Sequence, residues 1–231
     1  MNTTTDISVA RLLQFTDSAC PVGAFAFSCG LESAAANGIV HDSTTLKEFA
    51  RVNAIQSAFS DGIAALHAHR ATSVGDYESI LLSDKTLFMT KMNDETRSML
   101  CKMGRKLTEL SLAITQHPIL ERFLVDIKNN NTPGTYPVIQ GIYFSSLGIN
   151  EHDLFISHQY GVINMILSAA LRCIRVSHID TQKILFELLN ETLALYDEIK
   201  DYGIDEINAF FPELDLLASI HEKGNSRMFM S

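Results

Sequence analysis

The chain has 231 residues, of which 46% are hydrophobic and 19% charged, a composition typical of a globular protein and too apolar for a disordered one. Its 18 basic and 27 acidic side chains give a formal net charge of −9, which argues against nucleic acid as a partner because phosphate binding needs a basic surface. Four irregularly spaced cysteines and a start without an apolar segment predict a reduced, cytoplasmic protein that is neither exported nor disulfide-bonded.

The first two predicted helices flank the sequence Cys20-Pro21. Asp6 can cap a first helix that ends before this proline. The segment Pro21–Glu32, PVGAFAFSCGLE, is predicted to begin a second helix that Asn37-Gly38 terminates. In that helix Ala26, Gly30 and Ala34 recur every four residues, so they would form a smooth stripe that a neighbouring helix can approach closely.

Helical periodicity continues through the middle of the chain. Residues 42–45 offer capping side chains for a long third helix, whose apolar stripe is Val52, Ile55, Phe59, Ile63 and Leu66. Apolar residues at helical spacing predict another long helix from Met92 to Ile114. Residues 129–135, NNNTPGT, are rich in turn formers and predict a loop.

The second half of the chain is also predicted to be helical. Residues 138–147 and 160–174 are apolar nearly all round, which is typical of helices in the middle of a bundle. An amphipathic helix is expected from Thr181 onwards, and a short last helix from Phe211-Pro212 to about Lys223-Gly224. With no alternating strand pattern, we expect an all-α, single-domain helical bundle of about eight to ten helices over residues 1–223, followed by a tail at 224–231.

A search for catalytic, cofactor or metal sites yields none. The chain lacks both Gly-x-x-x-x-Gly-Lys-Ser/Thr and Gly-x-Gly-x-x-Gly, so it carries neither the P-loop nor the dinucleotide-binding pattern. His67 and His69 are two residues apart and would point to nearly opposite sides of a helix. His152 and His158 lack nearby cysteines. Cys20 and Cys29 form no Cys-x-x-Cys pair, so each is expected to be a small buried hydrophobe.

Two further features of the sequence are Arg172 and the apolar C-terminal tail. Arg172 ends a strongly apolar helix, and an arginine buried there would need a carboxylate or helix-end carbonyls, so it is predicted to be a structural clamp. The tail after Gly224 carries Arg227, Met228, Phe229 and Met230, whereas solvated tails are usually polar. Arginine and aromatic residues are frequent interface anchors, so the tail is expected either to be disordered or to fold onto a partner.

Taken together, these motifs resemble the UreF family of urease accessory proteins. The N-terminal motif reads Pro-x-Gly-x-Phe-x-x-Ser-x-Gly-Leu-Glu and the C-terminal one Ser-Arg-x-Phe-Met-Ser. Residues 95–97 with 103–104 resemble the family's Glu-x-Arg…Met-Gly helix, and residues 141–149 its Gly-x-x-x-x-x-Leu-Gly-Ile helix. Departures from the family pattern are Phe25 for tyrosine, Tyr136 for histidine, and residues 175–179 in the Pro-Leu-Gly-Gln-Thr segment.

The resemblance implies a non-enzymatic maturation factor without a cofactor. Such proteins form homodimers, bind UreD (UreH in some organisms), recruit the GTPase UreG, and support GTP-dependent nickel insertion into apo-urease. It implies partner-binding roles for the two terminal motifs, at Pro21, Gly23, Phe25, Ser28, Gly30, Glu32, Arg227, Met228 and Phe229. It implies structural roles for Arg97, Gly104, Gly141, Gly148, Arg172 and Gln182.

Two other classes of function stay open. The chain could itself be a nickel-binding chaperone or a small helical hydrolase that uses Cys20, Cys29 or a histidine. It could also be a helical adaptor for another metalloenzyme. Tight stoichiometric nickel binding by the purified chain would favour the first of these over a scaffold.

Overall fold

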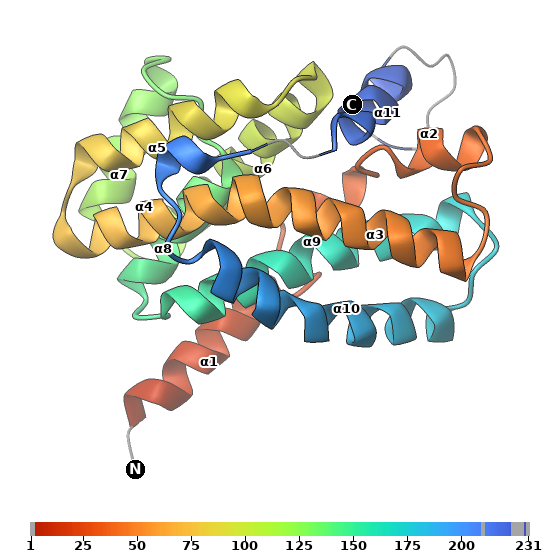
Figure 1. Cartoon of the computed structure of the whole chain (residues 1–231). Coiled ribbons are helices and arrows are strands. Elements are labelled where there is room, and N and C mark those ends of the chain that lie inside the picture. Colours follow the sequence, from red (N-terminus) through yellow and green to blue (C-terminus); the bar gives the residue numbers. More distant parts are fainter. Residues whose placement is uncertain (1–2, 209–210, 223–228, 230–231) are drawn as a thin grey trace.

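The computed structural model describes residues 3–208, 211–222 and 229, and within these ranges the chain is helical without any strand (Figure 1). The predicted all-α bundle is confirmed. The elements are α1 (Thr3–Thr16), η1 (Ala24–Ala26), α2 (Leu31–Ala36), α3 (Ser43–Ser57), η2 (Ala58–Gly62), α4 (Ile63–Val74), α5 (Tyr77–Thr90), α6 (Asp94–Ile114), α7 (Pro118–Lys128), α8 (Tyr136–Ser146), α9 (Glu151–Cys173), α10 (His178–Ile199), η3 (Ile204–Glu206) and α11 (Pro212–Glu222).

The longest helical stretch runs without a break through α3, η2 and α4 across the front of Figure 1. The Asp42 carboxylate accepts a hydrogen bond from the Thr45 backbone N–H at 2.8 Å, which satisfies a donor that the first helical turn leaves unpaired. The cap and the long helix predicted from the sequence are both confirmed. What periodicity did not show is that η2, in its middle, is a π-helix.

Helix α8 lies in the centre of the bundle, and its residues 137–144 are all buried. A Cβ atom at Gly141 would lie 2.4 Å from the carbonyl oxygen of Ala65 in α4, and one at Gly104 in α6 would lie 2.2 Å from that of Gly134. Real Cβ atoms essentially never approach so closely. Both glycines therefore allow backbones to meet around α8.

The predicted loop at 129–135 is held by one buried carboxylate. Asp84 of α5 accepts hydrogen bonds from the Gly134 and Thr135 backbone N–H groups, both at 2.7 Å, and from the hydroxyls of Thr132 and Thr135. Four donors compensate the cost of burying this side chain. The loop thus reaches α8 in a fixed conformation.

The other residues expected to be structural lie in different surroundings. Arg97 forms a 3.6 Å ion pair with Asp94 and lies over the Phe88 ring. Gly148 ends the turn after α8 with a φ of +72°. Gln182 is exposed on α10. Arg172 is exposed, so its expected burial is wrong. Its guanidinium is near the end of α9, where side chains still reach solvent.

The N-terminal motif does not form the single helix predicted for it. The short helix η1 is followed by an extended residue, and α2 begins only at Leu31. Gly23, Cys29 and Gly30 have φ values of +86°, +51° and +79°, in the left-handed region that interrupts an α-helix. Ala26, Gly30 and Ala34 consequently do not line one helix face, and that prediction is wrong.

Helix α9 is long and apolar enough to cross a membrane by length and composition, with a mean hydropathy of 1.3 over an 18-residue window. It packs against α3, α10 and α8 instead, and 56% of that window is buried inside the protein. Its apolar character is that of a core helix in a bundle. This agrees with the central position predicted for residues 160–174.

The close contact between α8 and α4 leads to a stability prediction. Gly141→Ala should lower the free energy of unfolding by about 1–3 kcal/mol, because the added methyl group must push the helices apart. Gly161→Ala is the matched control, since a Cβ there meets nothing within 4 Å. The control should be neutral or stabilising by up to about 1 kcal/mol. Urea denaturation of both variants would measure this, and equal stabilities would contradict the packing role of Gly141.

Candidate functional site

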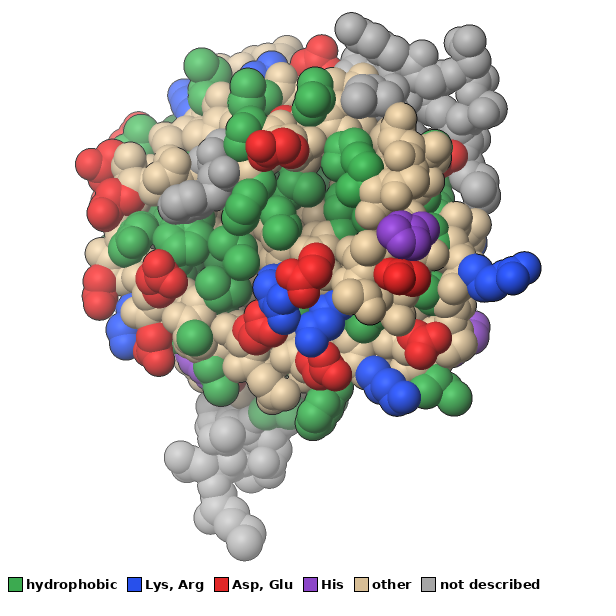
Figure 2. Space-filling model, turned by 45° about the vertical axis from the view of Figure 1, so that its right-hand side comes forward, with side chains coloured by type: hydrophobic (Ala, Val, Ile, Leu, Met, Phe, Trp, Pro, Cys, Tyr) green, Lys and Arg blue, Asp and Glu red, His purple; other side chains and the backbone are tan. Residues whose placement is uncertain are grey.

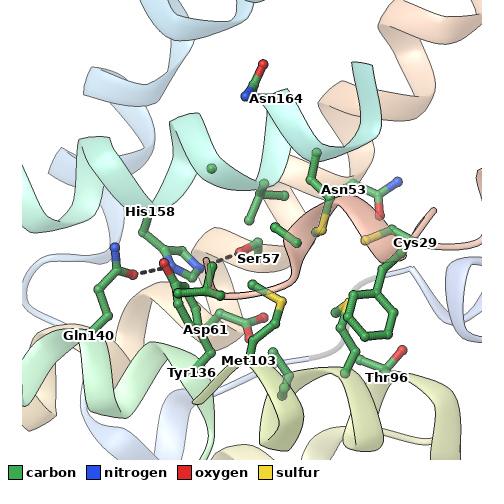
Figure 3. Close-up of a pocket in the computed structure, with 18 of the residues that line it drawn as sticks. Cys29, Asn53, Ser57, Asp61, Thr96, Met103, Tyr136, Gln140, His158 and Asn164 are labelled. Carbon is green, nitrogen blue, oxygen red and sulfur yellow. Dashed lines mark hydrogen bonds between the residues drawn. The ribbon is translucent and has the colours of Figure 1, made fainter. Parts of the chain in front are cut away.

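A cavity of about 180 Å³ lies inside the bundle, between the end of α1, the α3–η2 junction, α6, α8, α9 and α11 (Figure 3). Asp17, Ser18 and Gly161 line it and are exposed, so it reaches the surface between α1 and α9. Most of its wall is apolar, but it includes a group of buried polar side chains. These are Ser57, Asp61, Lys91, Glu95, Gln140, Ser157 and His158.

The π-helix η2 shapes one wall of this cavity. Ser57 is the last residue of α3, and η2 begins immediately after it. Ser60 and Asp61 within η2 are 1% and 7% exposed although they are polar. Single-turn π-helices inside α-helices are rare and frequently occur at functional sites. The widened turn is therefore an independent reason to inspect this part of the chain.

Three of the polar side chains form a hydrogen-bonded row. His158 Nε2 lies 3.1 Å from Ser57 Oγ, and His158 Nδ1 lies 2.9 Å from Gln140 Oε1. The residues come from α9, α3 and α8, and Figure 3 shows them converging at one end of the cavity. Burial of the imidazole lowers the pKa of His158. The neutral ring therefore predominates at neutral pH.

A buried ion pair lies next to this row. Lys91 Nζ donates to Asp61 Oδ2 at 2.5 Å and to Ser60 Oγ at 3.1 Å, and Ser60 Oγ donates to the same carboxylate at 2.9 Å. Burial alone would raise the pKa of Asp61, but the nearby Lys91 ammonium holds that pKa below its ordinary value. Asp61 is therefore a carboxylate at neutral pH.

Helix α11 forms another part of the cavity wall. Asp215 Oδ1 accepts a 2.7 Å hydrogen bond from the Asn93 side-chain amide, which ties α11 to the cap of α6. A Cβ at Gly30 would meet the Leu217 Cβ and the Ala218 backbone nitrogen, both at 3.3 Å. Gly30 thus allows α11 to pack directly onto the start of α2.

The cysteines in the cavity wall are poorly suited to nucleophilic or metal-binding roles. Burial raises the pKa of the Cys29 thiol to about 12, helped by the carboxylates of Asp61 and Glu95, and burial also raises the pKa of Cys20. The thiolate is the reactive and metal-binding form. A cysteine hydrolase or a thiolate nickel site is therefore disfavoured here.

The histidines considered as ligands are occupied in the fold. His67 Nε2 lies 2.9 Å from the Tyr202 carbonyl oxygen, and His69 Nε2 lies 2.8 Å from that of Ile149. No group of three or more His, Cys, Asp or Glu side chains suited to a metal ion occurs among the residues that the structure describes. The residues present therefore do not build a resident metal centre in those parts.

The motif residues expected to bind a partner are divided between surface and interior. Pro21 and Gly23 are exposed and Glu32 is half-buried, whereas Ser28 and Gly30 are buried. The Phe25 side chain lies outside what the structure describes. The accessible part of the motif is thus its beginning and Glu32.

The C-terminal motif meets the N-terminal one through Phe229. This residue is 5% exposed, its ring lies 4.0 Å beneath the Arg172 guanidinium, and its backbone N–H donates to Glu32 Oε2 at 3.3 Å. Arg227 and Met228 lie outside the described residues. Glu32 and Phe229 are 197 residues apart in the sequence. Their contact makes the two terminal motifs neighbours in the fold.

The sequence pattern does not group the cavity residues. It pairs His158 only with His152, because Ser57 and Gln140 are separated from His158 by 101 and 18 residues. One usable signal exists, because Asp61 is the one Asp, Glu, Lys or Arg residue between Arg51 and Arg70 of the predicted helix. A lone charge in such a stretch indicates an interior polar group.

Comparison with known proteins identifies relatives over almost the full length. A family model described as UreF matches residues 40–189. The chain is 49% identical to "Urease accessory protein UreF 2" of Brucella abortus (strain 2308), over 96% of this chain and 91% of that protein. It is 44% identical to "Urease accessory protein UreF" of Yersinia pseudotuberculosis serotype I (strain IP32953), over 95% of this chain and 96% of that protein.

The buried ion pair gives a second stability prediction. Lys91→Met should lower the free energy of unfolding by about 3–5 kcal/mol at pH 7, because it leaves the Asp61 carboxylate buried without its counter-charge. Lys47→Met, which removes the more exposed pair with Glu187, is the control and should cost about 1 kcal/mol or less. Chemical denaturation monitored by circular dichroism would measure both.

Comparing the wild-type protein with Lys91→Met at low pH shows whether the loss of stability comes from the uncompensated charge of Asp61 or from lost packing. The depressed pKa of Asp61 means that its contribution to stability is present above the unfolded-state pKa and is lost as the pH falls through the folded-state value. Protonated Asp61 no longer needs Lys91, so the gap between the wild-type protein and Lys91→Met should narrow in acid. A gap that is independent of pH would show that lost packing, not the uncompensated charge, causes the effect.

Proposed function

The chain belongs to the UreF family of urease accessory proteins, and from this membership we propose that its role in urease maturation is that of a non-enzymatic scaffold. In this role it joins UreD (UreH) and the GTPase UreG to apo-urease for the GTP-dependent insertion of nickel. The observation that supports the proposal is identity of 44–49% to urease accessory proteins over at least 95% of the chain.

The chemistry of the chain is compatible with a scaffold. Its sequence contains no P-loop motif, so GTP binding and hydrolysis in the assembly must be functions of a partner. The raised thiol pKa values and the occupied histidines argue against a nickel chaperone that binds through those residues. Nickel is here the cargo of the assembly.

We propose that the contact between the two terminal motifs forms the partner surface. Phe229 packs below Arg172 and bonds to Glu32, and Pro21 and Gly23 are exposed. Arg172 and Phe229 combine a guanidinium with an aromatic ring, a pairing common at the energetic centres of interfaces. Phe25, Arg227 and Met228 are proposed to extend this surface, and buried Ser28 and Gly30 to support it from inside.

The remaining features of the proposed role concern assembly and location. We propose that the protein acts as a homodimer in the cytoplasm. On the face seen in Figure 2 acidic and basic side chains are interspersed, with no extended basic area. This distribution and the net charge of −9 favour protein partners over nucleic acid.

Removal of residues 226–231 tests the scaffold proposal. In cells that co-express urease with UreD and UreG, this truncation should prevent co-purification of the partners and reduce urease activity to that of cells lacking the chain, since Arg227, Met228 and Phe229 are lost together. Phe186→Ala is a matched control, because Phe186 is 72% exposed on α10 and lies outside the proposed surface. It should leave assembly unchanged.

Circular dichroism of the purified truncated chain checks that it remains folded, so that lost assembly can be assigned to the surface. Full urease activation by the truncated chain would exclude the tail from the partner surface. Failure of the intact chain to raise urease activity in the same cells would contradict the scaffold function itself.

A further inference from the structure

Ser57, His158 and Gln140 form an arrangement that the scaffold role does not use. They come from three helices and are 6%, 5% and 2% exposed. The distances of 3.1 Å from Ser57 Oγ to His158 Nε2 and 2.9 Å from His158 Nδ1 to Gln140 Oε1 are both those of hydrogen bonds. A serine, a histidine and a group that orients the histidine are the parts of a serine nucleophile.

The hydrogen bonds determine which imidazole nitrogen carries the proton. Gln140 Oε1 is a carbonyl oxygen and can only accept, so His158 Nδ1 must be the donor. In the neutral ring Nε2 then has a free lone pair, and it accepts the hydrogen bond from the Ser57 hydroxyl. The ring is therefore set to remove the proton of Ser57.

The space beside Ser57 is large enough for a small molecule. Ser57, Gln140 and His158 all line the cavity of about 180 Å³. A smaller apolar cavity, of about 150 Å³, is already large enough to bind benzene. Phe15, Phe27, Met99 and Met103 supply apolar wall, which suits a short acyl or aryl group. The Lys91 ammonium and the Asp61 carboxylate line the same cavity as an ion pair.

We propose that Ser57 is an acyl-accepting nucleophile toward small carboxylic esters, with His158 as its general base and Gln140 as the residue that positions His158. Ser57 Oγ forms a bond to the carbonyl carbon of the ester, and its proton passes to His158 Nε2. The bond from that carbon to the alcohol oxygen breaks, and the alcohol leaves with the proton from Nε2.

Water then completes the cycle. It attacks the acyl-serine carbon and gives its proton to His158 Nε2, which returns it to Ser57 Oγ as the acyl bond breaks. The products are a carboxylic acid and an alcohol, and no oxidant, reductant or metal is consumed.

A fluorophosphonate probe and p-nitrophenyl acetate test the proposal on the purified full-length chain. Peptide mass spectrometry should find the phosphonyl adduct on Ser57, and p-nitrophenol release should exceed the rate of the same chain after Ser57→Ala by about 100-fold, within the range that a positioned base contributes. Ser168→Ala is the matched control, because Ser168 is half-buried and lines the same cavity. It should retain both labelling and hydrolysis.

Labelling of the wild-type chain does not require any variant to fold. A folded wild-type chain that forms no adduct at Ser57 would overturn the proposal. So would a His158→Gln variant that forms the adduct as well as the wild-type chain does. So would equal p-nitrophenol release by the wild-type chain and Ser57→Ala. These assays use the chain without UreD, UreG or urease, so their outcome is independent of the scaffold test.

The positioning role of Gln140 has its own readout in the pH profile of p-nitrophenol release. Gln140→Glu would place a carboxylate at His158 Nδ1, where it stabilises the imidazolium and raises the pKa of His158. Two charged groups already act on this ring: Asp61 raises its pKa and Lys91 lowers it. The acid limb of the profile should then move to higher pH. A lower rate with an unmoved acid limb would indicate a packing role and overturn the assignment of Gln140.

Discussion

Close packing around α8 is the constraint on which the bundle depends. Residues 137–144 of this helix are buried on every side, so its neighbours must approach it from several directions. Gly141 allows contact with the α4 backbone, and Gly104 allows the loop at 129–135 to pass across α6. Asp84 then fixes that loop with four hydrogen bonds. Without these devices α8 could not occupy the centre, because interiors pack to nearly crystalline density.

The same central position explains why the cavity can hold polar groups. Gln140 lies on α8, one residue before Gly141, and it reaches His158 of α9, which in turn reaches Ser57 of α3. Ser57 Oγ, both ring nitrogens of His158 and Gln140 Oε1 are hydrogen-bonded within this row, and Lys91 is bonded to Asp61 and Ser60. Hydrogen bonds in a low-dielectric interior hold such side chains in fixed positions. The fold therefore aligns three helices through a few specific bonds as well as through apolar contacts.

The sequence predicts the features that depend on residues close together in the chain, and it does not predict those that depend on contacts between distant segments. The apolar periodicity of residues 42–66 and 92–114 predicted long helices, and the cap at Asp42 was correct, because these depend on neighbours within a turn or two. The helix prediction for 21–32 is wrong because small residues are compatible with a helix, whereas Gly23, Cys29 and Gly30 adopt left-handed conformations. At Gly30 the close packing of α11 accompanies this conformation, and such a contact is not visible in the local sequence. The Ser57–His158–Gln140 row depends on contacts between distant segments, so the local sequence pattern does not predict it.

The structure separates an outer surface from an inner polar row, and the two make different demands on the chain. The contact of Phe229 with Arg172 and Glu32 brings both terminal motifs to one place, as a partner surface requires, and it needs no reactive group. The inner row needs a neutral imidazole, an oriented hydroxyl and a cavity, and it contributes nothing to that surface. Helix α11 lies beside both, because Asp215 and Ala218 line the cavity while Leu217 and Ala218 pack against Gly30 of the N-terminal motif.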